Sequence, residues 1–222
     1  MQTGCFVKPR LSEFQREILQ AFFRQQKSFY LTGGAALAEY HLGHRTTEDL
    51  DLFTRSAPLD EGDNALRETA RELGAQIEAL QTSPDFRRRL VRRGDEAVVV
   101  DLVRERVPRG EQEPQFHGGI AVDPPEEILA NKLCTLLSRA ELRDLVDVMA
   151  LQRAGFDLPD ALALASRKDA GMTPAQLAWV LSEIRIGDDA DIPGGCTVSE
   201  LRSFVESLQQ RLTRMAFPTV QD

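Results

Sequence analysis

Apolar residues recur along the first half of the chain with two periods, which predict alternating helices and strands. Spacings of three and four residues over 11–26 predict an amphipathic helix that Ser12 and Gln15 can cap. A short apolar run at 29–32 ends in two glycines, a short helix follows, and strict alternation at 49–55 predicts a second strand. A helix at 61–75 and strands at 76–83, 86–96 and 97–105 complete this half.

The pattern changes near Val122–Pro125, where the apolar spacing becomes almost wholly helical. Helices are predicted over 125–155, 158–167, 174–186 and 198–215, with a shift of apolar phase near Ser138–Glu141 inside the first of them. We therefore expect two domains, one at 1–122 and a helical one at 123–222. The order of elements predicts an α+β fold, in which a small mixed sheet flanked by helices precedes a helical C-terminal region.

Composition narrows the class of protein. The 222 residues are 42% hydrophobic, which is enough for a substantial core. A net charge of −8 argues against a protein that coats nucleic acid through its overall field, but it leaves an enzyme acting on RNA open. The cysteines Cys5, Cys134 and Cys196 lie far apart, which indicates a reducing compartment without disulfides. The sequence shows no signal peptide and no apolar run of membrane length, so we expect a soluble, cytoplasmic protein.

Two acidic residues interrupt the second predicted strand. Asp49 and Asp51 are two positions apart and share one face, while Leu50 and Leu52 take the opposite face and can enter the core. Neighbouring carboxylates repel one another unless a cation lies between them, and oxygen ligands of this kind suit Mg²⁺. Asp101 is a third carboxylate in a separate apolar strand, which sheet pairing can bring to the same point.

Gly33 and Gly34 lie where a strand passes into a helix, a pattern typical of phosphate binding. Without side chains there, phosphate oxygens can approach backbone N–H groups at a helix start that favours negative charge. Each signal alone is weak, because paired glycines and paired aspartates are also common in turns and surface strands. Together with the three aspartates, the glycines predict phosphoryl or nucleotidyl transfer with two metal ions about 3.5–4 Å apart.

Segment 29–53, FYLTGGAALAEYHLGHRTTEDLDLF, resembles the signature of the nucleotidyltransferase superfamily that has the polymerase-β-like fold. Arg45 and Thr46–Thr47 ahead of the paired aspartates make it most similar to the AbiEii/MenT group of toxin-type nucleotidyltransferases. A second block at 126–151, EEILANKLCTLLSRAELRDLVDVMAL, is similar to that group's lysine, arginine and Arg-Asp-x-x-Asp pattern. The distal helices carry no matching motif.

The resemblance implies roles for the first block. Gly33 and Gly34 would contact the triphosphate, and Thr47 would help to hold a phosphate near the turn. Asp49 and Asp51 would bind Mg²⁺.

For the rest of the site, the resemblance implies that Asp101 shares a metal and serves as the base for the acceptor hydroxyl. Lys132 would reach the phosphates, and Asp144 and Asp147 would complete the site. The residues alone leave another interpretation open, because Asp144 and Asp147 share a helix face. With Arg143 they can form solvated or intrahelical ion pairs, and Lys132 can be a surface lysine.

Two further groups have open interpretations. The arginines between 87 and 93 are either a solvated strand face or a phosphate-binding strip for an RNA acceptor. His41 and His44 are more readily a packed or exposed pair on a helix than half of a zinc site, and His117 is expected in a turn.

The expected function is therefore Mg²⁺-dependent transfer of a nucleoside monophosphate (NMP) from a nucleoside triphosphate (NTP) to a hydroxyl, with release of pyrophosphate. The acceptor is open between RNA, such as tRNA, and a small molecule. The resemblance implies the toxin of a toxin–antitoxin or phage-defence system, with a cognate antitoxin as partner. The alternative is a degenerate, non-catalytic module that binds a nucleotide or a partner.

Overall fold

The computed structural model describes residues 10–217, so the predictions for Cys5 and for the N-terminal segment lie outside the described residues. Contacts divide the chain into two compact units. The first, here called the sheet unit, runs up to Arg104 and includes Phe116–Ala121. The second, the helical unit, comprises Glu105–Gln115 and the chain from Val122 onward. The proposed domain division at 122/123 stays a prediction.

The sheet unit is built on a mixed sheet that has seven strands within the described part of the chain, in the order β3-β4-β5-β2-β1-β7-β6. Strand β2 runs parallel to β5 and antiparallel to β1, and β4 runs antiparallel to both β5 and β3. The elements are α1 (Glu13–Gln25), β1 (Tyr30–Thr32), α2 (Gly33–Ala36), the π-helix η1 (Leu37–His41), β2 (Asp49–Thr54), α3 (Leu59–Glu72), β3 (Gln76–Ser83), β4 (Phe86–Arg93), β5 (Glu96–Arg104), β6 (Gln115–His117) and β7 (Ile120–Val122).

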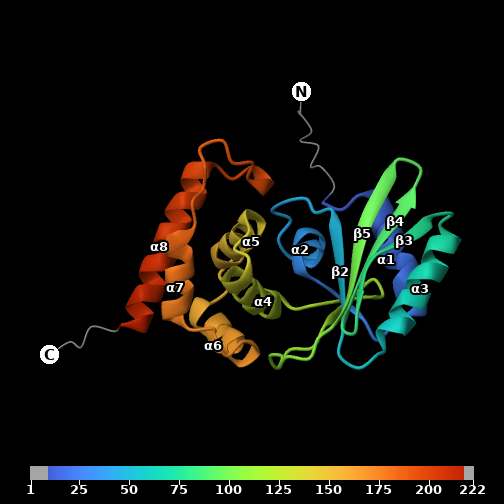
Figure 1. Cartoon of the computed structure of the whole chain (residues 1–222), viewed down its shortest axis with the longest axis horizontal. Coiled ribbons are helices and arrows are strands. Elements are labelled where there is room, and N and C mark those ends of the chain that lie inside the picture. Colours follow the sequence, from blue (N-terminus) through green and yellow to red (C-terminus); the bar gives the residue numbers. More distant parts are fainter. Residues whose placement is uncertain (1–9, 218–222) are drawn as a thin grey trace. The chain divides into compact units, whose positions relative to one another are not determined.

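The alternation along β2 sorts its side chains between the two faces of the sheet. Leu50 and Leu52 are fully buried, while Asp49 and Asp51 are half-buried on the other face. Helices α1 and α3 cover the leucine face, and α2 lies on the other side of β2 (Figure 1). Helix α1 begins with the predicted cap, a reciprocal pair of hydrogen bonds between Ser12 and Gln15.

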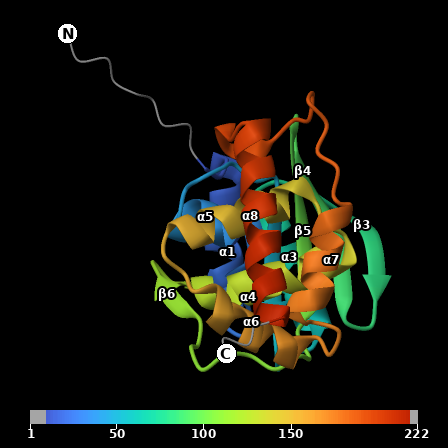
Figure 2. The same cartoon turned by 90° about the vertical axis from the view of Figure 1, so that its left-hand side faces the viewer.

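The helical unit follows the predicted pattern closely. It consists of α4 (Pro125–Ser138), α5 (Leu142–Arg153), α6 (Leu158–Lys168), α7 (Pro174–Glu183), a short 3₁₀ turn η2 (Pro193–Gly195) and α8 (Val198–Ala216). The break expected near Ser138–Glu141 is confirmed, and Ala140 there has a left-handed φ of 46°. Helices α7 and α8 pack side by side (Figure 2).

A buried ionic network fixes segment 105–115 to the helices of its own unit. Lys168 of α6 pairs with Glu105 and with Glu127 of α4, and Arg109 pairs with Glu105 and with Asp123. These side chains are almost completely buried. Because each buried charge has an opposite partner, the network holds the segment without leaving a desolvated charge unpaired.

The predicted fold class, an α+β nucleotidyltransferase-type sheet followed by a helical region, is confirmed. Strands β6 and β7 were not predicted, because three-residue strands are too short to show a period. The short helix predicted after the two glycines is present as α2 and the π-helix η1. Cys134 and Cys196 are both free thiols, and burial raises the pKa of Cys134 to about 11. None of the described helices is long and apolar enough to cross a membrane.

Candidate active site

The three predicted carboxylates lie on one face of the sheet. Asp51 of β2 is directly in register with Asp101 of the parallel strand β5, and Asp49 is in register with Val99. Residues in register across a pair of strands project from the same side, as do residues two apart along a strand. Asp49, Asp51 and Asp101 therefore share one surface, here called the carboxylate face. Sheet pairing brings Asp101 to the other two, as the sequence predicted.

A guanidinium that the sequence analysis did not assign to the site lies on the same face. Arg88 of β4 is in register with Asp101 and donates two hydrogen bonds to it, Nε to Oδ1 at 2.9 Å and Nη2 to Oδ2 at 2.7 Å. The hydrogen bond with Asp101 is the largest cause of a raised pKa of Arg88, and the charges of Asp49 and Asp51 add to it. All three carboxylates thus raise the pKa of Arg88.

The glycine turn lies directly beside the carboxylate face. Gly33 has a left-handed φ of 64°, and a Cβ atom there would collide with Oδ2 of Asp51. A Cβ atom on Gly34 would lie 2.5 Å from Nη2 of Arg45 and 3.3 Å from Oγ1 of Thr47. The left-handed backbone favours glycine at position 33, and a side chain at position 34 would displace the guanidinium of Arg45. The structure brings both glycines together with Asp51 and Thr47.

Helix α1 holds the loop that carries Thr47. Gln15, whose side chain also closes the cap of α1, donates a hydrogen bond from Nε2 to the carbonyl oxygen of Thr47 at 3.1 Å. Arg45 is buried and donates to the carbonyl oxygen of Thr46 at 2.9 Å. Arg45 is part of the family resemblance, but no role was predicted for it. A guanidinium this close to a candidate phosphate-binding turn indicates a role in phosphate binding.

The carboxylate oxygens of Asp49 and Asp51 suit a hard cation, whereas those of Asp101 are engaged by Arg88. Mg²⁺ is usually held by one or two carboxylates, with water and substrate phosphates supplying the other oxygens. Asp49 and Asp51 meet that requirement, whereas both oxygens of Asp101 accept hydrogen bonds from Arg88. Among residues 10–217, no three His, Cys, Asp or Glu side chains form a group that could hold a metal ion as they stand. The residues fit a cation bound by two carboxylates and completed by phosphate.

The remaining predicted residues form an ion-pair cluster within the helical unit. Nζ of Lys132, on α4, lies 2.7 Å from Oδ1 of Asp144 and 2.6 Å from Oδ2 of Asp147, both on α5. Nε of Arg139 lies 3.3 Å from Oδ2 of Asp144. Both aspartates are completely buried, so the alternative of solvated ion pairs and a surface lysine is wrong. The catalytic role of Asp144 and the nucleotide-binding roles of Lys132 and Asp147 stay predictions.

The arginine run is divided between the two faces of β4, so the single exposed strip that was considered does not form. Arg88 and Arg92 alternate with Leu90 on the carboxylate face. On the other face, Arg87 and Arg89 pair with Asp60 and Asp63 of α3, and Arg93 pairs with Glu17 of α1. Most of these guanidinium charges are therefore engaged by carboxylates of the chain itself.

His41 and His117 make ring contacts. His41 ends the π-helix, and its ring stands edge-on to that of His117 with centroids 6.3 Å apart. His117 is the last residue of β6 rather than part of the turn, which Gly118 and Gly119 form with positive φ angles. The interpretation of His41 as a packing residue agrees with this contact.

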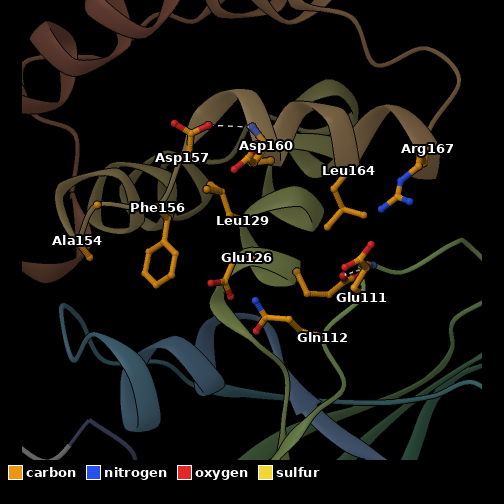
Figure 3. A pocket seen from close by; sticks show the side chains of 14 residues that line it. Glu111, Gln112, Glu126, Leu129, Ala154, Phe156, Asp157, Asp160, Leu164 and Arg167 are labelled. Carbon is orange, nitrogen blue, oxygen red and sulfur yellow. Dashed lines mark hydrogen bonds between the residues drawn. The ribbon is translucent and has the colours of Figure 1, made fainter.

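A pocket of about 700 Å³ in the helical unit contains none of the predicted site residues (Figure 3). Five carboxylate residues line it, together with Arg167: Glu111, Glu126, Glu127, Asp157 and Asp160. An acidic lining of this kind repels a triphosphate. The pocket is therefore not the triphosphate site, in spite of its volume.

One known protein family matches most of the chain. The family described as nucleotidyl transferase AbiEii toxin, type IV toxin–antitoxin system, matches residues 17–214. The chain belongs to this family. The matched region contains every predicted site residue, and the AbiEii resemblance inferred from the two sequence blocks is confirmed.

Solved structures share the fold of this AbiEii family member. MenT4, a nucleotidyltransferase toxin from Mycobacterium tuberculosis, superposes with a TM-score of 0.62 at 16% identity, over 90% of this chain and 82% of MenT4. JHP933 from Helicobacter pylori gives a TM-score of 0.53 at 21% identity, over 93% of this chain and 96% of its own. At these identities the likeness shows the fold alone. No curated protein matches the sequence of the chain.

Proposed function

We propose that the chain transfers an NMP from an NTP to a hydroxyl group, with Mg²⁺ bound at Asp49 and Asp51. The observation that carries the proposal is the position of Asp51, which is in register with Asp101 and in contact with the Gly33 turn. One side chain thus links a cation-binding surface to a turn that phosphate oxygens can approach. The nucleotidyl transferase family of the chain supports the same chemistry.

In the proposed reaction, the acceptor oxygen forms a bond to the α-phosphorus, the bond between the α-phosphorus and the bridging oxygen breaks, and pyrophosphate leaves. Bound Mg²⁺ would supply charge stabilisation for the phosphate oxygens. Asp49 and Asp51 hold the cation, and the backbone of Gly33 and Gly34 leaves room for the triphosphate. The family resemblance assigns the proton of the hydroxyl to Asp101, whose two oxygens both face Arg88 in the structure.

Arg45 and Thr47 are proposed to bind phosphate oxygens from the side of Gly34. The guanidinium and the hydroxyl both lie next to the position that a Cβ atom of Gly34 would take. A guanidinium binds phosphate through charge-assisted hydrogen bonds, which are about twice as strong as neutral ones. This pair would hold the phosphates beside the glycine turn.

The family also supports a biological role as a toxin with an antitoxin partner. For the acceptor we propose an RNA such as tRNA, with a small-molecule hydroxyl as the competing substrate. Since most arginines of β4 pair with the chain's own acids, RNA binding would depend on a few local contacts rather than a long basic strip.

Incubation with each NTP labelled at the α-phosphorus, together with total RNA and a pool of small hydroxyl compounds, tests the proposal. We expect label in one acceptor class with the wild type and none with Asp49→Asn/Asp51→Asn. Asp95→Asn in the exposed β4–β5 turn is the matched control and should keep wild-type transfer. Transfer that survives in the double variant would refute the assignment.

A non-catalytic nucleotide- or partner-binding module is the second candidate, and the engagement of Asp101 by Arg88 is the observation that favours it. A ligand that binds only the native state raises the melting temperature. A module that binds only a protein partner would show no shift with Mg²⁺ and any NTP. A shift without label transfer would indicate nucleotide binding without catalysis.

A further inference from the structure

Arg88 is held at the carboxylate face by contacts on two sides. Its guanidinium makes the two parallel hydrogen bonds to Asp101, and it lies 5.6 Å from the ring centre of Phe86. The fork geometry of a guanidinium matches a carboxylate, so this pair is directional as well as charged. Asp101 is nearly buried, with 8% of its side chain exposed, whereas 41% of the Arg88 side chain is exposed. Arg88 is therefore the solvent-exposed member of the pair.

The position of Arg88 differs from that of its neighbour Arg89. Arg89 points to the opposite face, where its buried guanidinium ties β4 to Asp63 of α3 and to the carbonyl oxygen of Gln81. That arrangement joins a helix to the sheet. Arg88 joins no helix to the sheet through Asp101, since both residues are on paired strands that already share backbone hydrogen bonds. Its contribution at this place is the charge that it brings to the carboxylates.

A guanidinium keeps its positive charge at every pH at which the protein is folded. Asp101 is the carboxylate that a second divalent ion would need, because it is the member of the face that lies on a different strand from Asp49 and Asp51. While Arg88 donates to both of its oxygens, Asp101 is already neutralised, and a second dication close to Arg88 would also meet its repulsion.

We propose that Arg88 takes the place of a second divalent cation at Asp101, so that the chain holds one such ion, at Asp49 and Asp51. Asp101 then anchors Arg88 through both of its oxygens. Arg88 is a positioning residue in this arrangement and leaves a fixed positive charge facing the substrate side of the sheet. The inference rests on the proposed function only in assigning a cation to Asp49 and Asp51.

Counting bound Mn²⁺ by electron paramagnetic resonance, with no nucleotide present, tests this inference. We expect one Mn²⁺ per chain in the wild type and two in Arg88→Gln. The second ion should disappear in Arg88→Gln/Asp101→Asn, because its carboxylate is gone. Arg92→Gln is the matched control, since Arg92 lies on the same face of β4 opposite Ala97, and it should bind one ion. Equal counts in wild type and Arg88→Gln, or two ions in the wild type, would overturn the inference.

A second measurement uses the wild-type chain and does not depend on the folding of a variant. With arginine labelled by ¹⁵N, the Nε–H signal of Arg88, assigned with Arg88→Lys, should remain unchanged at saturating Mg²⁺. Loss of that signal's hydrogen-bonded shift would show that the ion displaces Arg88 and would overturn the inference. The proposed function is tested separately, because Asp49→Asn/Asp51→Asn should remove the single Mn²⁺ of the wild type whatever Arg88 does.

Discussion

The two groups of aspartates in this chain differ in their access to solvent and in the partners that hold them. Asp49 and Asp51 are half-buried on the open face of β2, beside a glycine turn. Asp144 and Asp147 are completely buried, and one ammonium group, that of Lys132, binds both of them. A buried charge without its partner is costly, whereas a half-exposed carboxylate keeps part of its hydration. The first pair is therefore accessible to a ligand from solution, whereas the second is enclosed with the ammonium group of Lys132.

This difference does not follow from the spacing of the residues. Asp49 and Asp51 are two apart on a strand, and Asp144 and Asp147 are three apart on a helix, so each pair shares a face. What separates the pairs is their tertiary surroundings, which for the helical pair include a lysine on another helix, 12 residues before Asp144. Paired carboxylates in a sequence thus indicate a site for a positive charge, and the tertiary structure decides how accessible that site is to solvent.

Removing the internal cation gives the largest expected effect on stability. Lys132→Met leaves Asp144 and Asp147 buried without their ammonium partner, and breaking a buried pair in this way costs about 3–5 kcal/mol. Urea unfolding monitored by circular dichroism measures the loss. Lys27→Met, at an exposed lysine, is the control and should stay within about 0.5 kcal/mol of the wild type.

A partial rescue sharpens this test. Adding Asp144→Asn and Asp147→Asn to Lys132→Met removes the two buried charges that have lost their ammonium partner, so the triple variant should be more stable than the single one. If Lys132→Met alone unfolded at the same urea concentration as the wild type, the buried cluster would not be the internal ion pair described here.

The glycine turn gives the next largest effect. Gly33→Ala places a Cβ atom against Asp51 and forces a left-handed residue, and the backbone term alone is about 1–2 kcal/mol. Gly74→Ala is a close control, because Gly74 has a φ of 63° and no atom near the added Cβ. Both variants should lose stability through the backbone, but only Gly33→Ala should also displace Asp51 and lose NMP transfer. Equal NMP transfer by the two variants would show that the Gly33 turn is not part of the active site.

The long helices and strands, and the placement of Asp49 and Asp51 on one face, were predictable from the sequence. The patterns that reveal them involve residues close together along the chain. The alternation of Asp49 to Thr54 fixed both the strand and the side of each residue. The capping pair Ser12 and Gln15 fixed the start of α1, and the change of apolar phase located the break at Ala140.

The contacts that depend on strand register could not be read in the same way. Arg88 belongs to a run of five arginines, and nothing in that run distinguishes the arginine opposite Asp101 from its neighbours. Register is set by pairing between strands, and a shift by one residue would have moved Arg88 to the other face. The pairing of Lys132 with Asp144 and Asp147 depends in the same way on how α4 packs against α5.

The smallest expected effect is the change in the free energy of unfolding when Asp49 is replaced. It contrasts with the large loss expected for Lys132→Met. Asp49→Asn, measured by urea unfolding in the presence of a chelator, should change the free energy of unfolding by no more than about 1 kcal/mol, because ionic contacts of half-exposed carboxylates contribute little. The same substitution should weaken Mn²⁺ binding and NMP transfer. A loss of several kcal/mol would show that Asp49 is held by the fold as tightly as Asp144 is, and the carboxylate face would then be a structural ion cluster instead of a ligand site.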